Sequence, residues 1–285
     1  MHCEDLRARC APPGNAALCA LPLAIGSWTR SLPPDPRELA ALCHTRPMEW
    51  FSWDFDHPAY FTIYADKAKD AALEGPALAT LLDLPPRSRV LDLPCGWGRL
   101  HPYLRRKGLE VIGGDLSPLN LVKHRACHPA PLVRLDFRAL PFRPACADGV
   151  FCAFTSWGYF ASEAENLKQL TEFARVLRPG GVLLLDLAGR SFLQSSVTEV
   201  EGMWLEFPED GYQERAAWSP DGRRILTERT CQGASFRHDI WIPTDVEIRT
   251  FLHEAGFKVS QAFGGLDGRP WEEAAERWIY RAIKR

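Results

Sequence analysis

Apolar residues gather in short runs from about residue 48 onward, and longer segments with helical periodicity separate these runs. Apolar strands that alternate with helices are typical of a parallel sheet covered on both faces. Strands of one sheet are expected at residues 89–93, 110–115, 131–135, 149–154, 182–186, 257–263 and 276–283. Helices are expected at residues 60–82, 116–124, 163–177 and 244–255, with another that ends at Lys107. The pattern predicts an α/β fold with a doubly wound, mostly parallel, seven-stranded sheet.

Residues 190–243 interrupt this alternation. Polar and apolar residues alternate over residues 197–241 as in half-buried strands, and a Pro-Asp-Gly turn at residues 220–222 divides them. We interpret residues 190–243 as an antiparallel, β-rich insertion that caps the substrate, within one domain of residues 48–285.

Residues 1–47 differ from the rest, because they are rich in proline and hold four of the nine cysteines. Proline disrupts helix interiors, so we expect a loosely ordered leader, with Met48 as an alternative start. The cysteines form no Cys-x-x-Cys pair, which favours a reduced, cytoplasmic compartment and predicts no metal site. No apolar stretch reaches the ~18 residues of a membrane span, so no membrane association is expected.

Chemistry-bearing residues follow the first predicted strand. The turn from Asp92 to Arg99 contains Gly96 and Gly98, and glycine lets a ligand approach the backbone closely. His101 stands where a dinucleotide fingerprint needs Gly or Ala, and the Gly-Lys-Ser/Thr of a phosphate-binding loop is absent. The turn indicates a nucleotide-like ligand that is not held by a pyrophosphate.

The run Val-Leu-Asp-Leu-Pro-Cys-Gly-Trp-Gly-Arg, which ends at Arg99, resembles motif I of the class I S-adenosylmethionine (SAM) dependent methyltransferases. Three further elements match this family in order: Asp115 ends the second strand, Asp136 follows the third, and Leu-Arg-Pro-Gly-Gly at residues 177–181 precedes the fifth. The resemblance covers about residues 60–285. It implies a Rossmann-like methyltransferase sheet, SAM as the cofactor and a SAM-dependent methyltransferase activity.

The resemblance implies that Asp115 accepts hydrogen bonds from the ribose hydroxyls and that Asp136 meets the adenine amino group, and carboxylates are suited to both roles. Leu116 and Phe137 are then expected beside the adenine ring. Pro94 departs from the family, which usually has glycine there, and proline offers no amide contact because it has no N–H. The expected cofactor-binding residues are Asp92, Pro94, Cys95, Gly96, Gly98, Asp115, Leu116, Asp136, Phe137 and Phe154.

The acceptor is expected at the carboxyl end of the fourth strand. There, residues 154–160, Phe-Thr-Ser-Trp-Gly-Tyr-Phe, resemble a small-molecule subgroup of the family with an antiparallel insertion after strand five. We therefore expect methyl transfer to N or O of a small-molecule acceptor that the protein aligns with the methyl group. The expected substrate-binding residues are Tyr60, Tyr64, Trp157 and Tyr159, and the candidate catalytic bases are Tyr159 and His238.

Two alternative functions stay open. A macromolecular acceptor, RNA or protein, would fit a basic groove around Arg134, Arg138 and Arg143, but the formal net charge of −2 argues against nucleic acid. A non-catalytic SAM-binding module would fit Pro94 and the lack of an obvious base. Salt-sensitive co-purification with RNA would favour the first alternative, and SAM binding without transfer to any acceptor would favour the second. The sequence predicts no oligomeric state.

Overall fold

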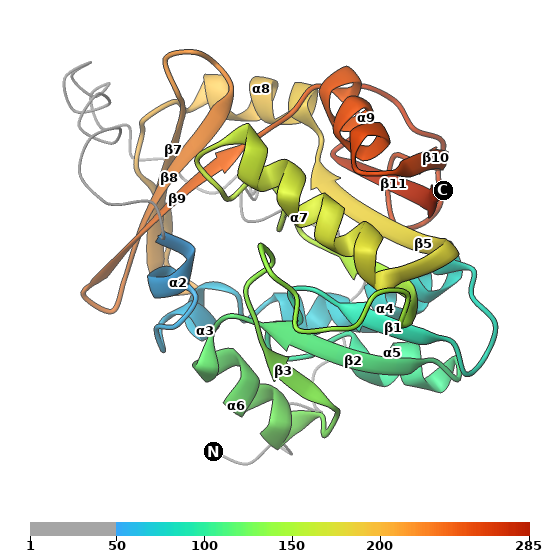
Figure 1. The fold of residues 1–285 in the computed structure, drawn as a ribbon. Helices are drawn as coiled ribbons and strands as arrows, with labels where there is room; N and C mark the ends of the chain where they lie inside the picture. The colour runs from blue at the N-terminus through green and yellow to red at the C-terminus, as the bar shows by residue number, and fades with distance from the viewer. Residues whose placement is uncertain (1–49) are drawn as a thin grey trace.

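The computed structural model describes residues 50–285, so the expectations for residues 1–47 and for Met48 lie outside the described part of the chain. Its centre is a seven-stranded sheet (Figure 1). In spatial order its strands are β10 (Phe257–Phe263), β11 (Arg277–Lys284), β5 (Leu177–Ala188), β4 (Ala147–Cys152), β1 (Arg89–Asp92), β2 (Glu110–Asp115) and β3 (Leu132–Arg134). Strand β11 runs antiparallel to β5 and β10, and the other neighbouring strands are parallel.

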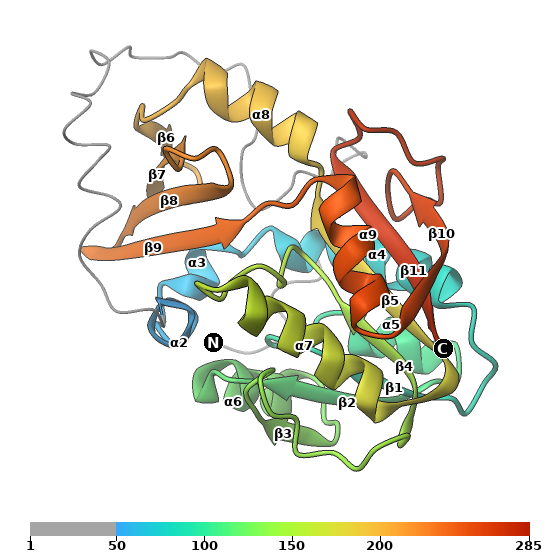
Figure 2. The same ribbon diagram turned by 45° about the horizontal axis from the view of Figure 1, so that its top comes forward.

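Helices cover both faces of this sheet (Figure 2). Helices α7 (Glu163–Val176) and α9 (Asp245–Glu254) lie on one face. Helices α4 (Lys67–Leu82) and α5 (His101–Arg106) lie on the other, and α6 (Pro118–Cys127) lies beside α5. The doubly wound, Rossmann-like fold that the sequence predicted is therefore confirmed.

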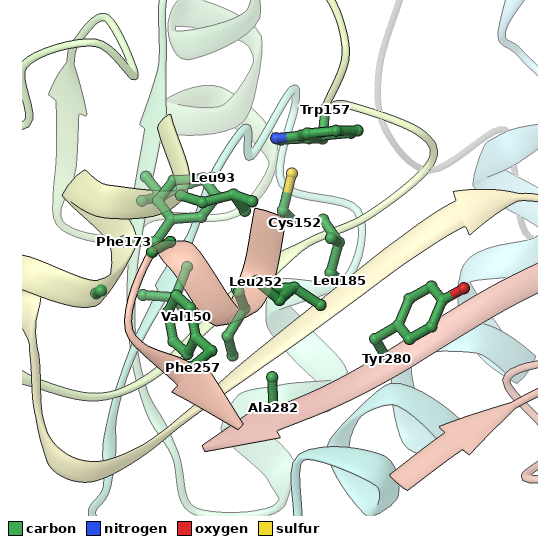
Figure 3. Close-up of a cluster of buried hydrophobic side chains, with 14 of the residues drawn as sticks. Leu93, Val150, Cys152, Trp157, Phe173, Leu185, Leu252, Phe257, Tyr280 and Ala282 are labelled. Atoms are coloured by element: carbon green, nitrogen blue, oxygen red, sulfur yellow. The ribbon is translucent and has the colours of Figure 1, made fainter. Parts of the chain in front are cut away.

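The space between the sheet and helices α7 and α9 is filled by apolar side chains (Figure 3). Val150 and Leu185 from neighbouring strands meet Phe173 and Leu252 from the two helices, and all four are fully buried. Burial of each such side chain contributes roughly 1.5–3 kcal/mol. Cys152 lies in the same cluster and acts as a small core residue.

Local sequence signals set the helix boundaries. The Ser117 side chain accepts a hydrogen bond from the Asn120 backbone and begins α6. Thr244 and Glu247 form a reciprocal capping box at the start of α9. Gly108 follows α5 with a φ of +81°, a left-handed conformation that glycine adopts readily.

The predicted insertion is a second, separate sheet that stands beside the carboxyl ends of the central strands (Figure 2). Its four antiparallel strands are β6 (Leu205–Phe207), β7 (Tyr212–Trp218), β8 (Arg224–Cys231) and β9 (Ala234–Trp241). The turn at residues 220–222 joins β7 to β8, as the sequence predicted. The sequence did not predict helix α8 (Arg190–Glu199), because its serines are weak helix formers; packing of Leu193 and Val197 stabilises it.

The helix expected at residues 60–82 is divided, and another short helix precedes it. Helix α2 (Trp50–Asp54) and helix α3 (Tyr60–Ile63) lie between the insertion and the central sheet, and α4 follows after a turn. Asp54 accepts a hydrogen bond from the backbone of Arg237 in β9 at 2.7 Å. Asp56 accepts from Ser117 Oγ at 2.8 Å and so joins this segment to the start of α6. None of the helices within residues 50–285 has the length and apolar character that crossing a membrane requires.

Candidate cofactor and acceptor site

A cavity lies at the carboxyl ends of β1, β2 and β4 and continues to the insertion. Ligand sites in open α/β sheets occur at this edge. The cofactor end of the cavity contains nine of the expected residues: Asp92, Pro94, Cys95, Gly96, Asp115, Leu116, Asp136, Phe137 and Phe154. The acceptor end contains aromatic side chains of residues 51–64 together with Ile225, Thr227, Arg229, His238 and Ile240 from strands β8 and β9.

The turn after β1 leaves room for a ligand at Gly96. Its φ is +50°, and no atom lies within 4 Å of the position that a Cβ would occupy. The Gly96 N–H donates to Asp115 Oδ2 at 2.8 Å, and the Ser117 N–H donates to Oδ1 at 2.9 Å. These two bonds fix the carboxylate beside the open space.

Burial raises the pKa of Asp115 to about 6, although the N–H groups of Ser117 and Gly96 oppose this shift. The side chain is therefore mostly ionised at neutral pH and becomes protonated in mild acid. Each carboxylate oxygen accepts one backbone bond and keeps capacity for another donor. Asp115 can thus accept hydrogen bonds from a diol.

Gly98 does not line the cavity, which corrects its expected role in cofactor contact. A Cβ at Gly98 would stand 1.9 Å from His124 Nε2, so the absent side chain makes room for this ring. His124 Nε2 lies 3.0 Å from His101 Nδ1, and His101 Nε2 lies 2.9 Å from Asp92 Oδ2. Burial lowers the pKa of His101 to about 3 and that of His124 to about 4, so both rings are neutral. We call Asp92, His101 and His124 the histidine chain.

Asp136 and Phe137 line the cavity next to Leu116. The guanidinium of Arg138 lies 2.6 Å from Asp136 Oδ2, and its hydrogen bonds lower the pKa of this carboxyl despite partial burial. Arg138 also pairs with Glu165 at 3.3 Å. Its charge is therefore balanced by two carboxylates, which weakens the hypothesis of a basic groove.

Phe154 forms part of the cavity floor in a left-handed backbone conformation, with a φ of +58°. Its N–H donates to Asp186 Oδ2 at 2.8 Å. The guanidinium carbons of Arg99 and Arg277 lie 4.2 and 4.7 Å from its ring centroid, and Arg277 also pairs with Asp186 and with Glu74. These contacts hold a conformation that a non-glycine residue rarely adopts.

Aromatic rings surround the acceptor end. Tyr60 and Tyr64 line it, with ring centroids 4.7 Å apart, and their role in substrate binding stays a prediction. Tyr159 also lines it, and its ring centroid lies 6.2 Å from that of Phe51 and 5.8 Å from that of Phe55. The sequence alone does not single out these two phenylalanines, because an aromatic-rich segment predicts core packing as readily as a binding site.

Trp157 is a core residue rather than a substrate contact. It is fully buried in the apolar cluster (Figure 3). Its Nε1–H donates to the backbone oxygen of Asn166 at 3.0 Å. Its ring centroid lies 5.2 Å from that of Trp241. The chain turns after Ser156. Ser156 and Tyr159 therefore line the cavity, whereas Trp157 lies in the core.

His238 lines the acceptor end but is held by an arginine. Arg229 Nη1 lies 2.8 Å from His238 Nδ1 and 3.0 Å from Tyr64 Oη, and Arg229 Nε bonds to Glu214. Glu214 and Arg229 are almost fully buried, and burial raises the pKa of Glu214 to about 7 although Arg229 opposes the shift. This pair was not predicted from the sequence. The available signal was a charged residue on the inward face of each of two predicted strands.

The geometry argues against His238 as a general base. An arginine can only donate, so Nδ1 must present its lone pair and the neutral ring carries its proton on Nε2. Burial and the charge of Arg229 lower the pKa of His238 well below its usual value, which disfavours a second proton. Tyr159 stays the candidate base. Within residues 50–285, no group of three His, Cys, Asp or Glu side chains is arranged to hold a metal ion.

Residues 91–185 match the profile of a family described as a methyltransferase domain. The seven-stranded sheet has the fold of solved SAM-dependent methyltransferases. Residues 91–185 therefore identify a SAM-dependent methyltransferase domain within the chain, and SAM is the cofactor of such domains.

Known proteins share this architecture. The chain is 32% identical over 108 residues to the putative methyltransferase YqeM of Bacillus subtilis, 36% of this chain and 44% of that protein. It is 26% identical over 234 residues to the dTDP-3-amino-3,4,6-trideoxy-alpha-D-glucopyranose N,N-dimethyltransferase of Streptomyces venezuelae, 75% and 91% of the two chains. The CcbJ methyltransferase of Streptomyces caelestis shares the fold, with a TM-score of 0.64, 20% identity and coverage of 74% and 89%. The chain spans about half the length of the first curated relatives that it matches.

Proposed function

We propose that this protein transfers the methyl group of SAM to a nitrogen or oxygen atom of a small-molecule acceptor. The observation that carries the proposal is one cavity lined both by the carboxylates of the family motifs and by side chains of the insertion. Residues 190–243 act in this proposal as a substrate cap within a single domain of residues 48–285.

The residues at the cofactor end fit SAM. Gly96 leaves open space beside Asp115, whose carboxylate can accept hydrogen bonds from both ribose hydroxyls. Asp136 can accept from the adenine amino group, with Leu116 and Phe137 beside the ring. SAM supplies a methyl group on a positively charged sulfonium. Pro94 lines the cavity and can contact SAM through its ring, but it has no backbone N–H to donate.

The residues at the acceptor end can align an acceptor and exclude water. Phe51, Phe55, Tyr60 and Tyr159 contribute aromatic surface to the cavity, and aromatic faces also favour a nearby cation. Alignment of the two reacting atoms is the main requirement for an in-line displacement. Tyr159 can take a proton from an acceptor that loses one.

The named relatives support a small acceptor. The Streptomyces venezuelae protein is an N,N-dimethyltransferase by name, and another relative, from Xanthomonas campestris, is a ubiquinone biosynthesis O-methyltransferase by name. The ion pairs of Arg138 give a nucleic acid acceptor little support. A cytoplasmic location belongs to the same proposal, and the buried cysteines agree with it, because Cys95, Cys152 and Cys231 form no disulfide within residues 50–285.

The first test is calorimetric binding of SAM and S-adenosylhomocysteine to wild type and to Asp115→Ala. Hydrogen bonds to a charged group contribute roughly 1.5–3 kcal/mol each, so the variant should bind about 100-fold more weakly. Asp267→Ala is the matched control, because Asp267 is exposed and its ion pair within residues 50–285 is with the exposed Arg269, at 3.5 Å. Absence of binding by the wild type would overturn the proposal.

Transfer itself is tested with methyl-labelled SAM and a broad panel of small metabolites. Label on a nitrogen or oxygen of a small molecule is the expected result, reduced in Asp115→Ala. Tight cofactor binding without transfer to any acceptor would favour the non-catalytic alternative.

A further inference from the structure

The acceptor end of the cavity contains a histidine whose proton position is fixed by the fold. His238 Nδ1 accepts from Arg229, and Arg229 in turn bonds to the buried Glu214. The three residues lie on β9, β8 and β7, so the sheet of the insertion sets their spacing. Tyr64 adds a contact to Arg229 from the segment between α3 and α4.

The opposite nitrogen of the ring, Nε2, carries the proton, because Nδ1 is held by Arg229. His238 lines the cavity, and among residues 50–285 its Nε2 makes no hydrogen bond. The ring lies between aromatic neighbours, with centroids 4.7 Å from Trp50 and 5.3 Å from Phe55. Ile240 and Ile225 add apolar surface. A fixed N–H donor in such surroundings favours an oxygen of the bound ligand.

The charges nearby favour a neutral oxygen. Glu214 balances the guanidinium of Arg229, and His238 is neutral. Above about pH 7, where Glu214 is ionised, the cluster of three side chains has no net positive charge to offer a carboxylate or phosphate.

The methylated atom itself is a poor partner for this donor. That atom must direct its lone pair at the methyl group, and a hydrogen bond to the same lone pair would weaken the nucleophile. The donor therefore suits a second polar atom of the acceptor, away from the reaction centre.

We propose that His238 is a specificity-determining residue whose Nε2–H donates to a neutral oxygen of the acceptor other than the methylated atom. The acceptor class is then a small molecule with a hydroxyl, ether or carbonyl oxygen near the atom that receives the methyl group. Glu214 and Arg229 are positioning residues, because they act through the tautomer of His238. The inference rests on the proposed function.

The tautomer is tested without any acceptor, by nitrogen NMR of protein labelled at histidine and bound to S-adenosylhomocysteine. We expect the Nε2–H tautomer and no protonation of His238 between about pH 6 and pH 8, where an ordinary histidine titrates. In the double variant Glu214→Gln/Arg229→Met, which leaves no unpaired buried charge, His238 should lose the fixed tautomer. A proton on Nδ1 in the wild type, or titration near pH 6.5 like an ordinary histidine, would overturn the inference.

The oxygen preference is tested with probes in the same complex. Benzyl alcohol and acetophenone carry a neutral oxygen, and toluene is their apolar match. We expect the two oxygen probes to shift the His238 Nε2 resonance and to bind at least fivefold more tightly than toluene, the scale of one hydrogen bond. Equal binding of the three probes would contradict the proposal.

Two variants at the same position separate the hydrogen bond from the packing. His238→Gln can still accept from Arg229 and donate to the cavity, so it should keep the oxygen preference, whereas His238→Met should lose it. His253→Gln, an exposed histidine of α9, is the control. Retention of the preference in His238→Met would overturn the proposal. Binding of S-adenosylhomocysteine, measured separately in every variant, tells a failure here from a failure of the proposed function.

Discussion

A buried carboxylate is linked to a histidine at each end of the cavity, directly at one end and through an arginine at the other. At the cofactor end, Asp92 contacts His101 directly, and His101 contacts His124. At the acceptor end, Arg229 stands between Glu214 and His238. The intervening arginine donates to Nδ1 and forces the histidine proton to the opposite nitrogen.

The comparison also separates two ways of building a site. Much of the cofactor end arises within one strand–helix–strand unit, because Asp92, His101 and Asp115 lie close in the sequence. The acceptor end combines residues far apart in the sequence: Tyr64 meets Arg229 across 165 positions. A local motif can therefore identify the first end, and only tertiary contacts assemble the second.

The largest expected effect is a loss of stability caused by a substitution at the acceptor end. Arg229→Met leaves Glu214 buried without its partner, and loss of one member of a buried pair costs about 3–5 kcal/mol of unfolding free energy. The loss should grow as pH rises from 6 to 8, because the buried carboxyl prefers its proton in the folded state while the unfolded chain releases it. Chemical denaturation at both pH values measures this.

Two companion variants sharpen the same experiment. Glu214→Gln/Arg229→Met should recover most of the lost stability. Arg269→Met, at an exposed pair, should cost less than about 1 kcal/mol. Equal losses in Arg229→Met and Arg269→Met would show that the buried pair contributes no more than an exposed one.

An intermediate loss of stability is expected from a substitution at the cofactor end. In Gly98→Ala the new methyl group meets the His124 ring, which must move away from His101. We expect about 2–4 kcal/mol of destabilisation, from overpacking and from the positive φ of +73°. Thermal or chemical denaturation gives the value.

The matched control for Gly98→Ala is Gly211→Ala. Gly211 has a φ of +70° and open space around its Cα, so its variant should show only the backbone cost of about 1 kcal/mol. Adding His124→Ala to Gly98→Ala should relieve the overpacking. Identical losses at the two glycines would mean that the histidine chain adapts without cost.

The smallest expected effect concerns pH at the cofactor end. Asp115 accepts from ribose hydroxyls best as a carboxylate, and its pKa lies near 6. The affinity for S-adenosylhomocysteine should therefore fall by up to about tenfold between pH 7 and pH 5. The histidine chain should not contribute, because His101 and His124 titrate near 3 and 4. Asp115→Asn should flatten the profile, and an unchanged slope in that variant would assign the pH dependence to another group.

Much of the fold followed from the sequence because its strands are short, apolar and bounded by clear signals. The strand expected at residues 257–263 matches β10, and the Pro-Asp-Gly turn joins β7 to β8. The continuous helix expected at residues 60–82 was wrong, because contacts of Asp56 with the start of α6 fix a separate segment. The periodicity of apolar residues indicates which face of a helix is buried. It carries no information about such distant contacts.

The sequence by itself determined the family, the doubly wound sheet and the carboxylates of the cofactor end. The reason is that strand ends and glycine turns depend on residues that are close together in the sequence. Tertiary structure decided the rest. It placed Trp157 in the core and Tyr159 at the cavity, although only Gly158 separates them. It gave Gly98 a packing role through His124, and it made His238 a donor through Arg229. The physical reason is that a side chain's direction and proton position depend on its neighbours in space, which the order of residues does not encode locally.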